Sequence, residues 1–364
     1  MDKKVVSILV FISTAVFVLF KIDFGGLLVS SKSLLDFDSY YVLSKDILTG
    51  ANPYTVSDQM QTLGPPLVIL PYLPFSNLPI NAGRVLFTAA NVLAVFVTCY
   101  LLSNNCFAKR KLEAFVILTA ILLTSFSARF TLELGQTGIF VALIITLVLF
   151  EKRVKVKSIL LALLISFKTF FLLSLLAVIR NKEVFFWSIF FLIIVGSLSL
   201  FFIDLNWYKY YLTEKFGALV FNNQSISGLD YYNQSFRSTL ARIGIGKYYW
   251  EILISFALYF AYYSFKSGNI LASLVFPIIV SPVSWQHYYV ILFPVFVITY
   301  KNMEKGPVNL SILGLSLFLW WLEIPVLHNK AEGLMYGILA SHYFISGILL
   351  FYLTTGLKLP KNKL

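Results

Sequence analysis

The stretch Ser158–Ile179, SILLALLISFKTFFLLSLLAVI, decides the fold of this chain because Lys168 lies in the middle of an otherwise apolar run. Two interpretations are open: a single span with a lysine in mid-membrane, or a helical hairpin with Lys168 at its tip. Both ends of the run are flanked by basic residues: Lys152, Arg153, Lys155, Lys157, Arg180 and Lys182. Cytoplasmic loops are rich in Lys and Arg, so both ends are expected in the cytoplasm, which favours the hairpin.

The arms of such a hairpin are short. About ten residues at about 1.5 Å each reach only half-way through an apolar core of about 30 Å. The tip therefore needs neighbouring helices or a water-filled cavity around it. The range Asn269–Tyr300 repeats the pattern, with SPVSWQHYY (Ser281–Tyr289) between two short apolar arms. The sequence thus predicts two hairpins.

Composition excludes a soluble protein. Of the 364 residues, 59% are hydrophobic and only 13% are charged, and the mean hydropathy is +0.81. A soluble domain could not cover that much apolar side chain with polar groups. The 35 Phe and 21 Tyr are typical of lipid-facing helices with aromatic belts. We therefore expect an all-α polytopic integral membrane protein.

Further apolar runs complete the topology. A retained anchor is expected at Val5–Phe20, because Lys21 follows it and no small-residue cleavage site does. The proline-rich run Leu67–Pro79 is too broken to span and should lie at the interface or dip in and return. Other spans are expected near 82–102, 113–128, 138–150, 184–203, 250–266, 308–322 and 334–356. With the hairpins this gives about twelve membrane segments in one domain, residues 1–364.

The distribution of charge supports this topology. The loops expected inside are 1–4, 103–113, 151–157, 180–183, 266–269, 301–307 and 357–364. In about 45 residues they hold 17 of the 29 Lys and Arg. Both termini are then cytoplasmic, in the plasma membrane. The net charge of +12 is explained by topology rather than by a nucleic-acid surface. Two long external loops remain, at about 22–80 and 204–249.

The first external loop carries two acids. Asp36 and Asp38 precede a short amphipathic helix expected at Tyr40–Leu48, which the turn sequence from Gly50 to Tyr54 ends. A carboxylate at the membrane edge can act as a general base toward a hydroxyl group. The alternatives are helix capping or simple solvation.

Other unusual polar residues fall on the same external side or at hairpin tips. Lys168 needs an anion, and a phosphate is the natural one at a membrane-facing cavity; the alternative is an ion pair with Glu133. Arg237 and Arg242 could hold phosphate or be solvated. His287 could bind substrate or be structural, as His328 and His342 are expected to be. Cys99 and Cys106 show no disulfide or metal spacing. We found no metal-ligand set and no nucleotide-binding loop, so no cofactor is expected.

The order of motifs resembles glycosyltransferase family 87, the polyprenyl-phosphate-mannose-dependent mannosyltransferases. The resemblance covers about residues 20–300. The motifs that carry it are Asp36-Phe-x-x-Tyr40, Gly50-Ala-Asn-Pro-Tyr54, Pro65–Pro79, Leu134-Gly-Gln-Thr-Gly138, Lys168, Asn233-Gln-Ser with Ala-Arg242, and Ser281-Pro-Val-Ser-Trp-Gln-His287. Asp38 is an additional acid, and Thr169 stands where the family often has proline after the lysine.

This resemblance implies a GT-C fold with an outward-facing active site and inversion at the anomeric carbon. It implies the following roles: Asp36 or Asp38 as the base; Lys168, Arg242 and Arg237 at the donor phosphate; and Tyr40, Gln136, Asn233, Gln234, Trp285 and His287 at the substrate, with no metal. The partners would be a polyprenyl-phosphate sugar donor, an extracytoplasmic lipid or glycan acceptor, and membrane lipids. The expected enzyme is a hexosyltransferase, with mannose as the expected sugar.

Two other classes of function remain open. One is a lipid-linked-sugar flippase or another polytopic transporter, which should show two related halves with paired broken helices. The other is a non-catalytic assembly protein. Long external loops that carry acids favour the enzyme.

Overall fold

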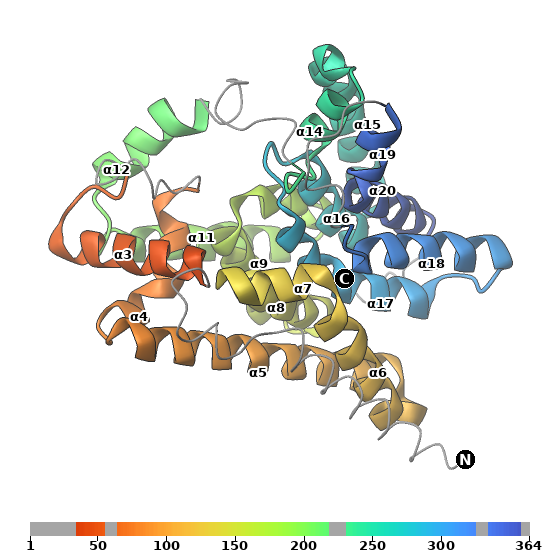
Figure 1. Ribbon diagram of the computed structural model, residues 1–364, viewed down its shortest axis with the longest axis horizontal. Coiled ribbons are helices and arrows are strands. Elements are labelled where there is room, and N and C mark those ends of the chain that lie inside the picture. The colour runs from red at the N-terminus through yellow and green to blue at the C-terminus, as the bar shows by residue number, and fades with distance from the viewer. Residues whose placement is uncertain (1–33, 55–63, 218–230, 325–333, 358–364) are drawn as a thin grey trace.

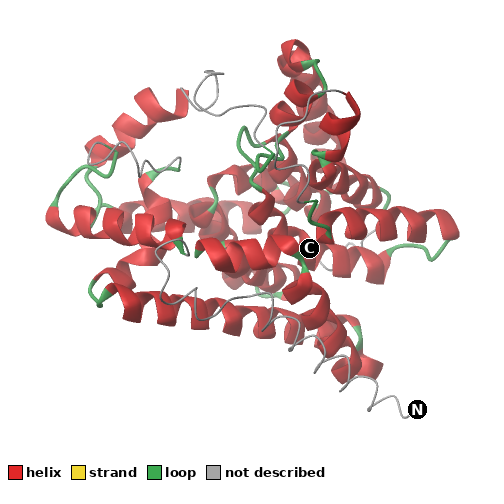
Figure 2. Ribbon diagram, viewed as in Figure 1, coloured by secondary structure: helices red, strands yellow, loops and turns green. Residues whose placement is uncertain are grey.

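The computed structural model describes residues 34–54, 64–217, 231–324 and 334–357. These residues fold almost entirely into helices (Figure 2), and within these ranges the only strand-like pairing is one bridge between Asn233 and Trp285. The all-α expectation is confirmed for this part of the chain. The anchor expected at Val5–Phe20, the sequence before Leu34 and His328 lie outside the described residues.

The first half of the chain runs from a helix in the first predicted external loop into a series of apolar helices. Its elements are α3 (Leu35–Thr49), η1 (Pro66–Tyr72), α4 (Leu73–Ser76), α5 (Ile80–Cys106), η2 (Ala108–Arg110), α6 (Lys111–Thr124), α7 (Phe126–Leu134), α8 (Gly138–Phe150), α9 (Val154–Phe167), η3 (Thr169–Ser174), α10 (Leu175–Val178) and α11 (Lys182–Ser199).

The second half begins with short helices in the second predicted external loop and ends in apolar helices. Its elements are α12 (Leu205–Tyr210), the π-helical turn η4 (Tyr211–Phe216), α14 (Phe236–Arg242), η5 (Gly246–Tyr248), α15 (Tyr249–Ser267), α16 (Ile270–Val280), η6 (Gln286–Leu292), α17 (Phe293–Asn302), α18 (Pro307–Trp321), α19 (Leu334–Leu339) and α20 (His342–Thr355).

The helices follow the apolar runs with three differences. Helix α3 begins at Leu35 rather than Tyr40, so that both acids lie in its first turn. The run near 113–128 is divided at Ser125, whose side chain caps α7 by accepting a hydrogen bond from the Ala128 N–H, and α7 bends away by 64°. The run at 334–356 is two helices, because the chain breaks between α19 and α20.

Lys168 interrupts the chain as the hairpin interpretation requires. It has an extended backbone, with φ −144° and ψ 97°, between α9 and η3. Ser158, near the start of α9, donates a hydrogen bond of 3.1 Å to the carbonyl of Val184, near the start of α11. Helix α9 carries the chain about 15 Å away from Ser158, so residues 168–183 must return over that distance. The chain therefore reverses direction at Lys168.

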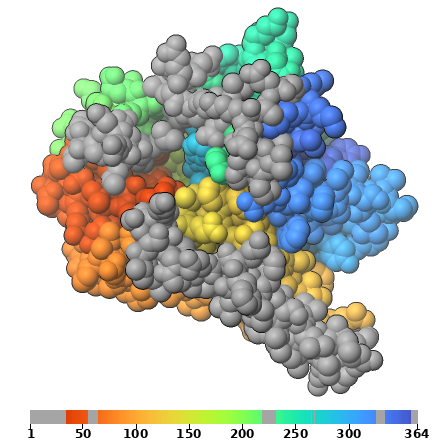
Figure 3. Space-filling view, viewed as in Figure 1, coloured from red at the N-terminus to blue at the C-terminus, as the bar shows by residue number. Residues whose placement is uncertain are grey.

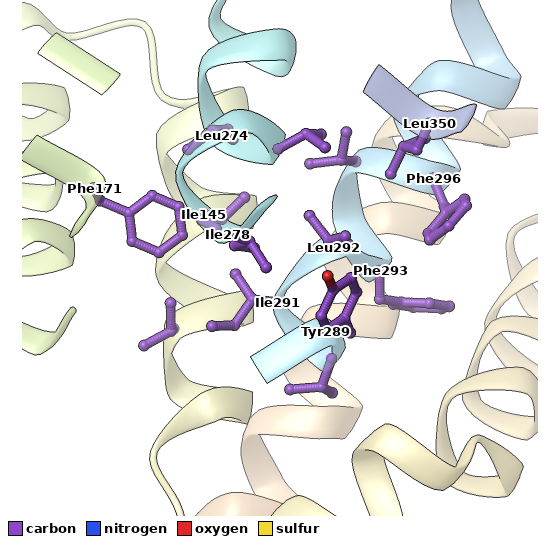
Figure 4. Close-up of a cluster of buried hydrophobic side chains, with 14 of the residues drawn as sticks. Ile145, Phe171, Leu274, Ile278, Tyr289, Ile291, Leu292, Phe293, Phe296 and Leu350 are labelled. Carbon is purple, nitrogen blue, oxygen red and sulfur yellow. The ribbon is translucent and has the colours of Figure 1, made fainter. Parts of the chain in front are cut away.

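The second predicted hairpin belongs to a cluster of buried hydrophobic side chains (Figure 4). Leu274 and Ile278 of α16 pack beside Ile291 and Leu292 of η6, all with no exposed surface. Phe171 of η3 is also fully buried in this cluster. Short helices that are apolar on every side need protein around them, and here the other helices provide it.

Several loops that the charge pattern assigns to the cytoplasm are joined to one another. Lys301 Nζ donates to the carbonyl of Asn105 over 2.5 Å, and Arg180 donates to the carbonyl of Lys266. At the other end of α5, Tyr41 of α3 donates to the carbonyl of Leu78 over 2.7 Å. Helix α3 therefore packs at the opposite end of α5 from Lys301, and Figure 1 shows α3 beside α4 and α5.

The number of membrane segments is confirmed only in part. Among the described residues, α5 and α11 are long and apolar enough to cross a membrane, and α6 with α7 would make a third if the bent pair is one span. Six further apolar segments of the described chain are shorter, with 10–17 residues each. About twelve segments and the GT-C fold therefore stay predictions.

Candidate active site

Asp36 is held at the start of α3 by the packing of its neighbours. The Leu34 N–H donates to the carbonyl of Glu133 over 2.7 Å, which ties the start of α3 to α7. Phe37 has no exposed surface and packs against aromatic rings of α3, η1, α4 and α5, namely Tyr41, Tyr72, Phe75 and Phe87. Asp36 lies in the first turn, where the helix dipole favours a negative charge.

The turn between α7 and α8 supplies the first partner of Asp36. Gln136 Nε2 donates to Asp36 Oδ2 over 2.6 Å. Gly135, just before it, has a φ of +71°, and a Cβ atom there would lie 2.5 Å from the Cβ of Phe37. Only glycine tolerates both this conformation and this approach. The close contact between the turn and α3 brings Gln136 to the carboxylate.

Lys168 adds a positive charge near this carboxylate, although within the described residues no ion pair joins the two side chains. It is buried, and its Nζ lies 4.0 Å from the centroid of the Tyr288 ring, a cation–π contact. Its charge also interacts with Asp36. The alternative partner, Glu133, instead interacts with Arg129 and Glu323, and Arg129 Nη2 lies 3.2 Å from Glu323 Oε2. Asp36, Gln136 and Lys168, which are far apart in sequence, thus form one cluster.

The environment of Asp36 suits a base. Burial raises the pKa of the Asp36 carboxyl above its ordinary value of 3.8, while the Gln136 hydrogen bond and the positive charge of Lys168 partly offset that increase. A raised pKa makes a carboxylate a stronger proton acceptor, and the hydrogen bond orients it.

Asp38 is engaged elsewhere. Arg84 Nε donates to Asp38 Oδ1 over 2.9 Å, and Arg84 Nη2 donates to Asp38 Oδ2. Both side chains are largely buried. Both carboxylate oxygens therefore bind one guanidinium, and the pair fastens the Asp36-bearing helix α3 to α5. The two acids, which the sequence leaves equivalent, have different surroundings.

Removing one partner of this ion pair should destabilise the protein. Asp38→Asn leaves the Arg84 charge buried without its counter-ion, and we expect the free energy of unfolding to fall by roughly 3 kcal/mol. The midpoint of a denaturant titration of the purified protein measures the change. The matched control is Glu151→Gln, which breaks the ion pair between Glu151 and Arg153, whose guanidinium is exposed, and should leave the midpoint unchanged. Equal midpoints for both variants would show that the Asp38–Arg84 pair does not hold α3.

Aromatic rings stand beside the cluster. Tyr40 is stacked on Tyr72, with ring centroids 4.5 Å apart and an interplanar angle of 13°. Tyr72 donates to the carbonyl of Gly135 over 3.4 Å. Tyr288 carries the Lys168 ammonium on its face. Residue patterns did not identify three residues of this site, Tyr72, Tyr288 and Arg84. The signal for Arg84 was its charge inside the apolar run at 82–102.

His287 lies behind the same cluster. It is only 4% exposed, and within the described ranges neither ring nitrogen has a hydrogen-bond partner. Its ring contacts those of Phe130 and Tyr288. A buried imidazole usually donates at least one hydrogen bond, so this position is suited to a polar group that is not part of the chain.

The remaining candidates form a second polar cluster. Asn233 Oδ1 accepts hydrogen bonds from the N–H groups of Ser235 and Ser284, each over 3.1 Å. It thereby joins the second predicted external loop to the segment before η6. Gln234 Nε2 donates to the carbonyl of Ala340 over 2.7 Å. Trp285 is half-buried and pairs with Asn233 through the backbone. These contacts hold loops together. A substrate role for Asn233, Gln234 and Trp285 stays a prediction.

The two arginines have protein partners. Arg242 Nη1 donates to the carbonyl of Asn233 over 2.8 Å, and Arg242 Nε and Nη2 donate to Ser341 Oγ over 3.1 Å and 3.0 Å. Arg237 lies over the ring of Tyr249, 5.8 Å from its centroid. Of the three candidate phosphate-binding cations, Lys168 is therefore the one whose charge lies near Asp36. His342 is buried between the carbonyls of Leu339 and Leu322, as a structural histidine would be.

Comparison with protein families gives one match. The description of glycosyltransferase family 87 fits residues 63–265, more than half of the chain. The matched range includes Gln136, Lys168 and Arg242, while Asp36 and His287 lie outside it. Comparison with curated proteins and with solved structures gives no match.

Proposed function

The chain belongs to glycosyltransferase family 87, and from this premise we propose that it is a membrane hexosyltransferase of the plasma membrane. It transfers a hexose, with mannose the expected sugar, from a polyprenyl-phosphate donor to an extracytoplasmic lipid or glycan. The observation that carries the proposal is the Asp36–Gln136–Lys168 cluster. It combines a proton acceptor with a cation at the end of the bundle opposite the basic loops.

In the proposed reaction Asp36 accepts the proton of the acceptor hydroxyl. The oxygen forms a bond to the anomeric carbon on the face opposite the phosphate. The bond between that carbon and the phosphate oxygen breaks, and its electron pair leaves with the polyprenyl phosphate. The anomeric configuration is therefore inverted. Negative charge grows on the leaving phosphate, and Lys168, already in place beside Asp36, stabilises it.

The surroundings of the two acids favour Asp36 as the base. Asp38 has both oxygens bound to Arg84, so a proton transfer to Asp38 would disrupt a largely buried ion pair. Asp36 has one oxygen on Gln136 and a pKa that burial raises. Gln136 then acts by orienting the base rather than by binding the sugar.

Substrate contacts are assigned to groups beside the Asp36–Gln136–Lys168 cluster and in the second polar cluster. The rings of Tyr40 and Trp285 offer flat apolar surfaces for the C–H faces of a sugar. His287, with unpartnered ring nitrogens, is a donor for a substrate oxygen. Asn233 and Gln234, in the second polar cluster, are the remaining candidates for substrate contacts. Arg237 and Arg242 would reach the donor phosphate only by giving up the contacts described above.

A lipid-linked-sugar flippase is the rival function, and the family match favours glycosyl transfer over it. Purified protein in nanodiscs, given polyprenyl-phosphate mannose and a membrane-lipid extract, should release polyprenyl phosphate and form a mannosylated product that mass spectrometry detects. Parallel reactions with polyprenyl-phosphate glucose and with a nucleotide sugar define the donor. Movement of the donor between leaflets without release of phosphate would establish the flippase instead.

The proposal also predicts the pH dependence. Asp36 must be ionised to accept a proton, so turnover falls as the pH drops through its pKa. Gln136→Leu removes a hydrogen bond that lowers this pKa, and the acidic limb of the kcat profile should move to higher pH. The alkaline limb serves as the internal control and should stay in place. An acidic limb that stays fixed or moves to lower pH would contradict the assignment of Asp36.

A further inference from the structure

Helix α11 has the surface of a helix in lipid. It is apolar enough to cross a membrane, yet only 17% of its residues are buried inside the protein. Phe186, Phe190 and Ile193 are exposed on it. Its 18 residues measure about 27 Å, close to the thickness of the apolar core. Ser199 therefore lies near a membrane boundary.

The exposed apolar surface does not end with α11. The next residues run toward α12 and η4 and include Phe201, 81% exposed, and Phe202, 53% exposed. Within α12 and η4, Leu205, Leu212 and Phe216 are 66%, 63% and 45% exposed. Large apolar side chains are unfavourable in a loop that is surrounded by water. An exposed apolar patch of this kind marks a surface that contacts another protein, a ligand or a membrane.

The opposite face of the same helices is fixed to the protein. Trp207 and Tyr211 are buried and pack in one cluster with Leu43 and Ile47 of α3 and with Ile69 of η1. The Asp204 side chain caps α12 by accepting a hydrogen bond of 2.8 Å from the Asn206 N–H. The helix cannot turn its apolar residues inward without losing this cluster.

The third face of α12 and η4, beside the exposed apolar face and the buried face, is polar. Asn206, Thr213 and Glu214 are exposed. Leu205 and Leu212 are seven residues apart, which places them on one side, and Asn206 and Thr213 have the same spacing on the adjacent side. An apolar stripe beside a polar one, next to the end of a membrane span, is the arrangement of a helix in the plane of a membrane surface.

We infer that α12 and η4, residues Leu205–Phe216, lie in the surface of the bilayer leaflet at the α3 end of the protein, with Leu205, Leu212 and Phe216 among the lipids. In Figure 3 this segment, light green, forms an outer edge of the molecule at the upper left. The evidence for lipid as the partner is continuity, because the patch extends the lipid-facing surface of α11. The inference needs a membrane-spanning chain and does not depend on the proposed reaction.

The position of the segment also links the leaflet to the candidate active site. Tyr211, on the buried face, lies with its ring 6.0 Å from that of Tyr54, and Tyr40 packs against the hydrophobic cluster that contains both of these residues. Tyr40 is in turn stacked on Tyr72 in the candidate site. A lipid-borne substrate that approaches along this helix would thus meet the site from the membrane side.

Spin labels test the inference on the full chain in nanodiscs. Cys106→Ser provides the background, since Cys99 is buried, and single cysteines are introduced at Leu205, Leu212 and Phe216. Matched positions on the polar stripe are Asn206 and Thr213. Power saturation then compares the accessibility of each label to molecular oxygen, which concentrates in lipid, with its accessibility to a water-soluble nickel chelate.

We expect high oxygen and low nickel accessibility at Leu205, Leu212 and Phe216, and the reverse at Asn206 and Thr213. High nickel accessibility at all five positions would place the helix in water and overturn the inference. Low accessibility to both reagents at the three apolar positions would show that protein, such as a second copy of the chain, covers the patch, which also overturns it. Turnover measurements do not enter this test, so failure of the proposed reaction leaves its outcome intact.

Discussion

Asp36→Asn should lower kcat by about three orders of magnitude, within the range measured for the loss of a general base. The amide has nearly the shape of the carboxylate but cannot accept the proton of the acceptor hydroxyl. Packing of α3 should survive, because Phe37 and the Leu34–Glu133 hydrogen bond hold it. Release of polyprenyl phosphate in nanodiscs measures the change, and donor binding should stay near the wild-type value.

Asp46→Asn is the matched control, since it makes the same substitution on the same helix, ten residues from Asp36, and should keep turnover. Asp38→Asn should lower stability while the folded fraction retains its activity. If the Asp36→Asn variant keeps the wild-type kcat, Asp36 is not the general base. A folded Asp38→Asn protein without turnover would instead make Asp38 the base, despite its contacts with Arg84.

The helices that residue patterns predicted best are those with unbroken apolar runs. Helix α8 begins and ends at the residues expected, Gly138 and Phe150, because Thr137 and Glu151 are polar boundaries. The break at Lys168 was also predictable, since burying a lone lysine in a helix between two basic loops conflicts with the charge pattern. The break at Ser125 was not expected, because a single serine in an apolar run looks like any other helical residue until its side chain caps α7.

The sequence predicted which residue types belong to the candidate site, but not which of these residues contact one another. Asp36 and Asp38 look equivalent in sequence, and what separates them is tertiary: Arg84 lies 46 residues from Asp38, and Gln136 lies 100 residues from Asp36. The same limit applies to Arg242, which looked like a phosphate ligand but donates to Asn233 and Ser341. A side chain's chemistry is local, while its availability depends on contacts that only the fold creates.

The apolar surface of α12 shows a further limit of pattern recognition. Leu205–Phe216 lies in a range that looked like a polar loop, because three different faces share twelve residues. Trp207 and Tyr211 face the protein, and Asn206 and Thr213 are exposed with Leu205. The mean hydropathy of the segment hides these three faces, because apolar and polar residues offset one another along the sequence. Only the packing of Trp207 against α3 and η1 shows which apolar residues stay exposed.

Lys168→Met should lower kcat/KM by about two orders of magnitude or more, the usual cost of removing one group that stabilises developing charge. Methionine keeps most of the length and apolar volume of the lysine but removes the charge that would meet the leaving phosphate. The same substitution also removes a cation that interacts with Asp36, so the acidic limb of the pH profile should move to higher pH. Lys168→Arg should recover part of the activity, because it restores a positive charge.

The matched control is Lys155→Met on the same helix, α9. Lys155 also stands over an aromatic ring, with its Nζ 4.7 Å from the centroid of Trp187, but it is exposed at the opposite end of the helix from Lys168, and its loss should leave kcat/KM unchanged. Affinity for polyprenyl phosphate, the leaving product, separates a phosphate ligand from a structural residue. Lys168→Met should weaken that affinity at least tenfold if the ammonium contacts phosphate, since one charge-assisted hydrogen bond contributes about 1.5 to 3 kcal/mol. Unchanged product affinity together with lower stability would make Lys168 a structural cation whose role is to hold Tyr288 and Asp36 in place.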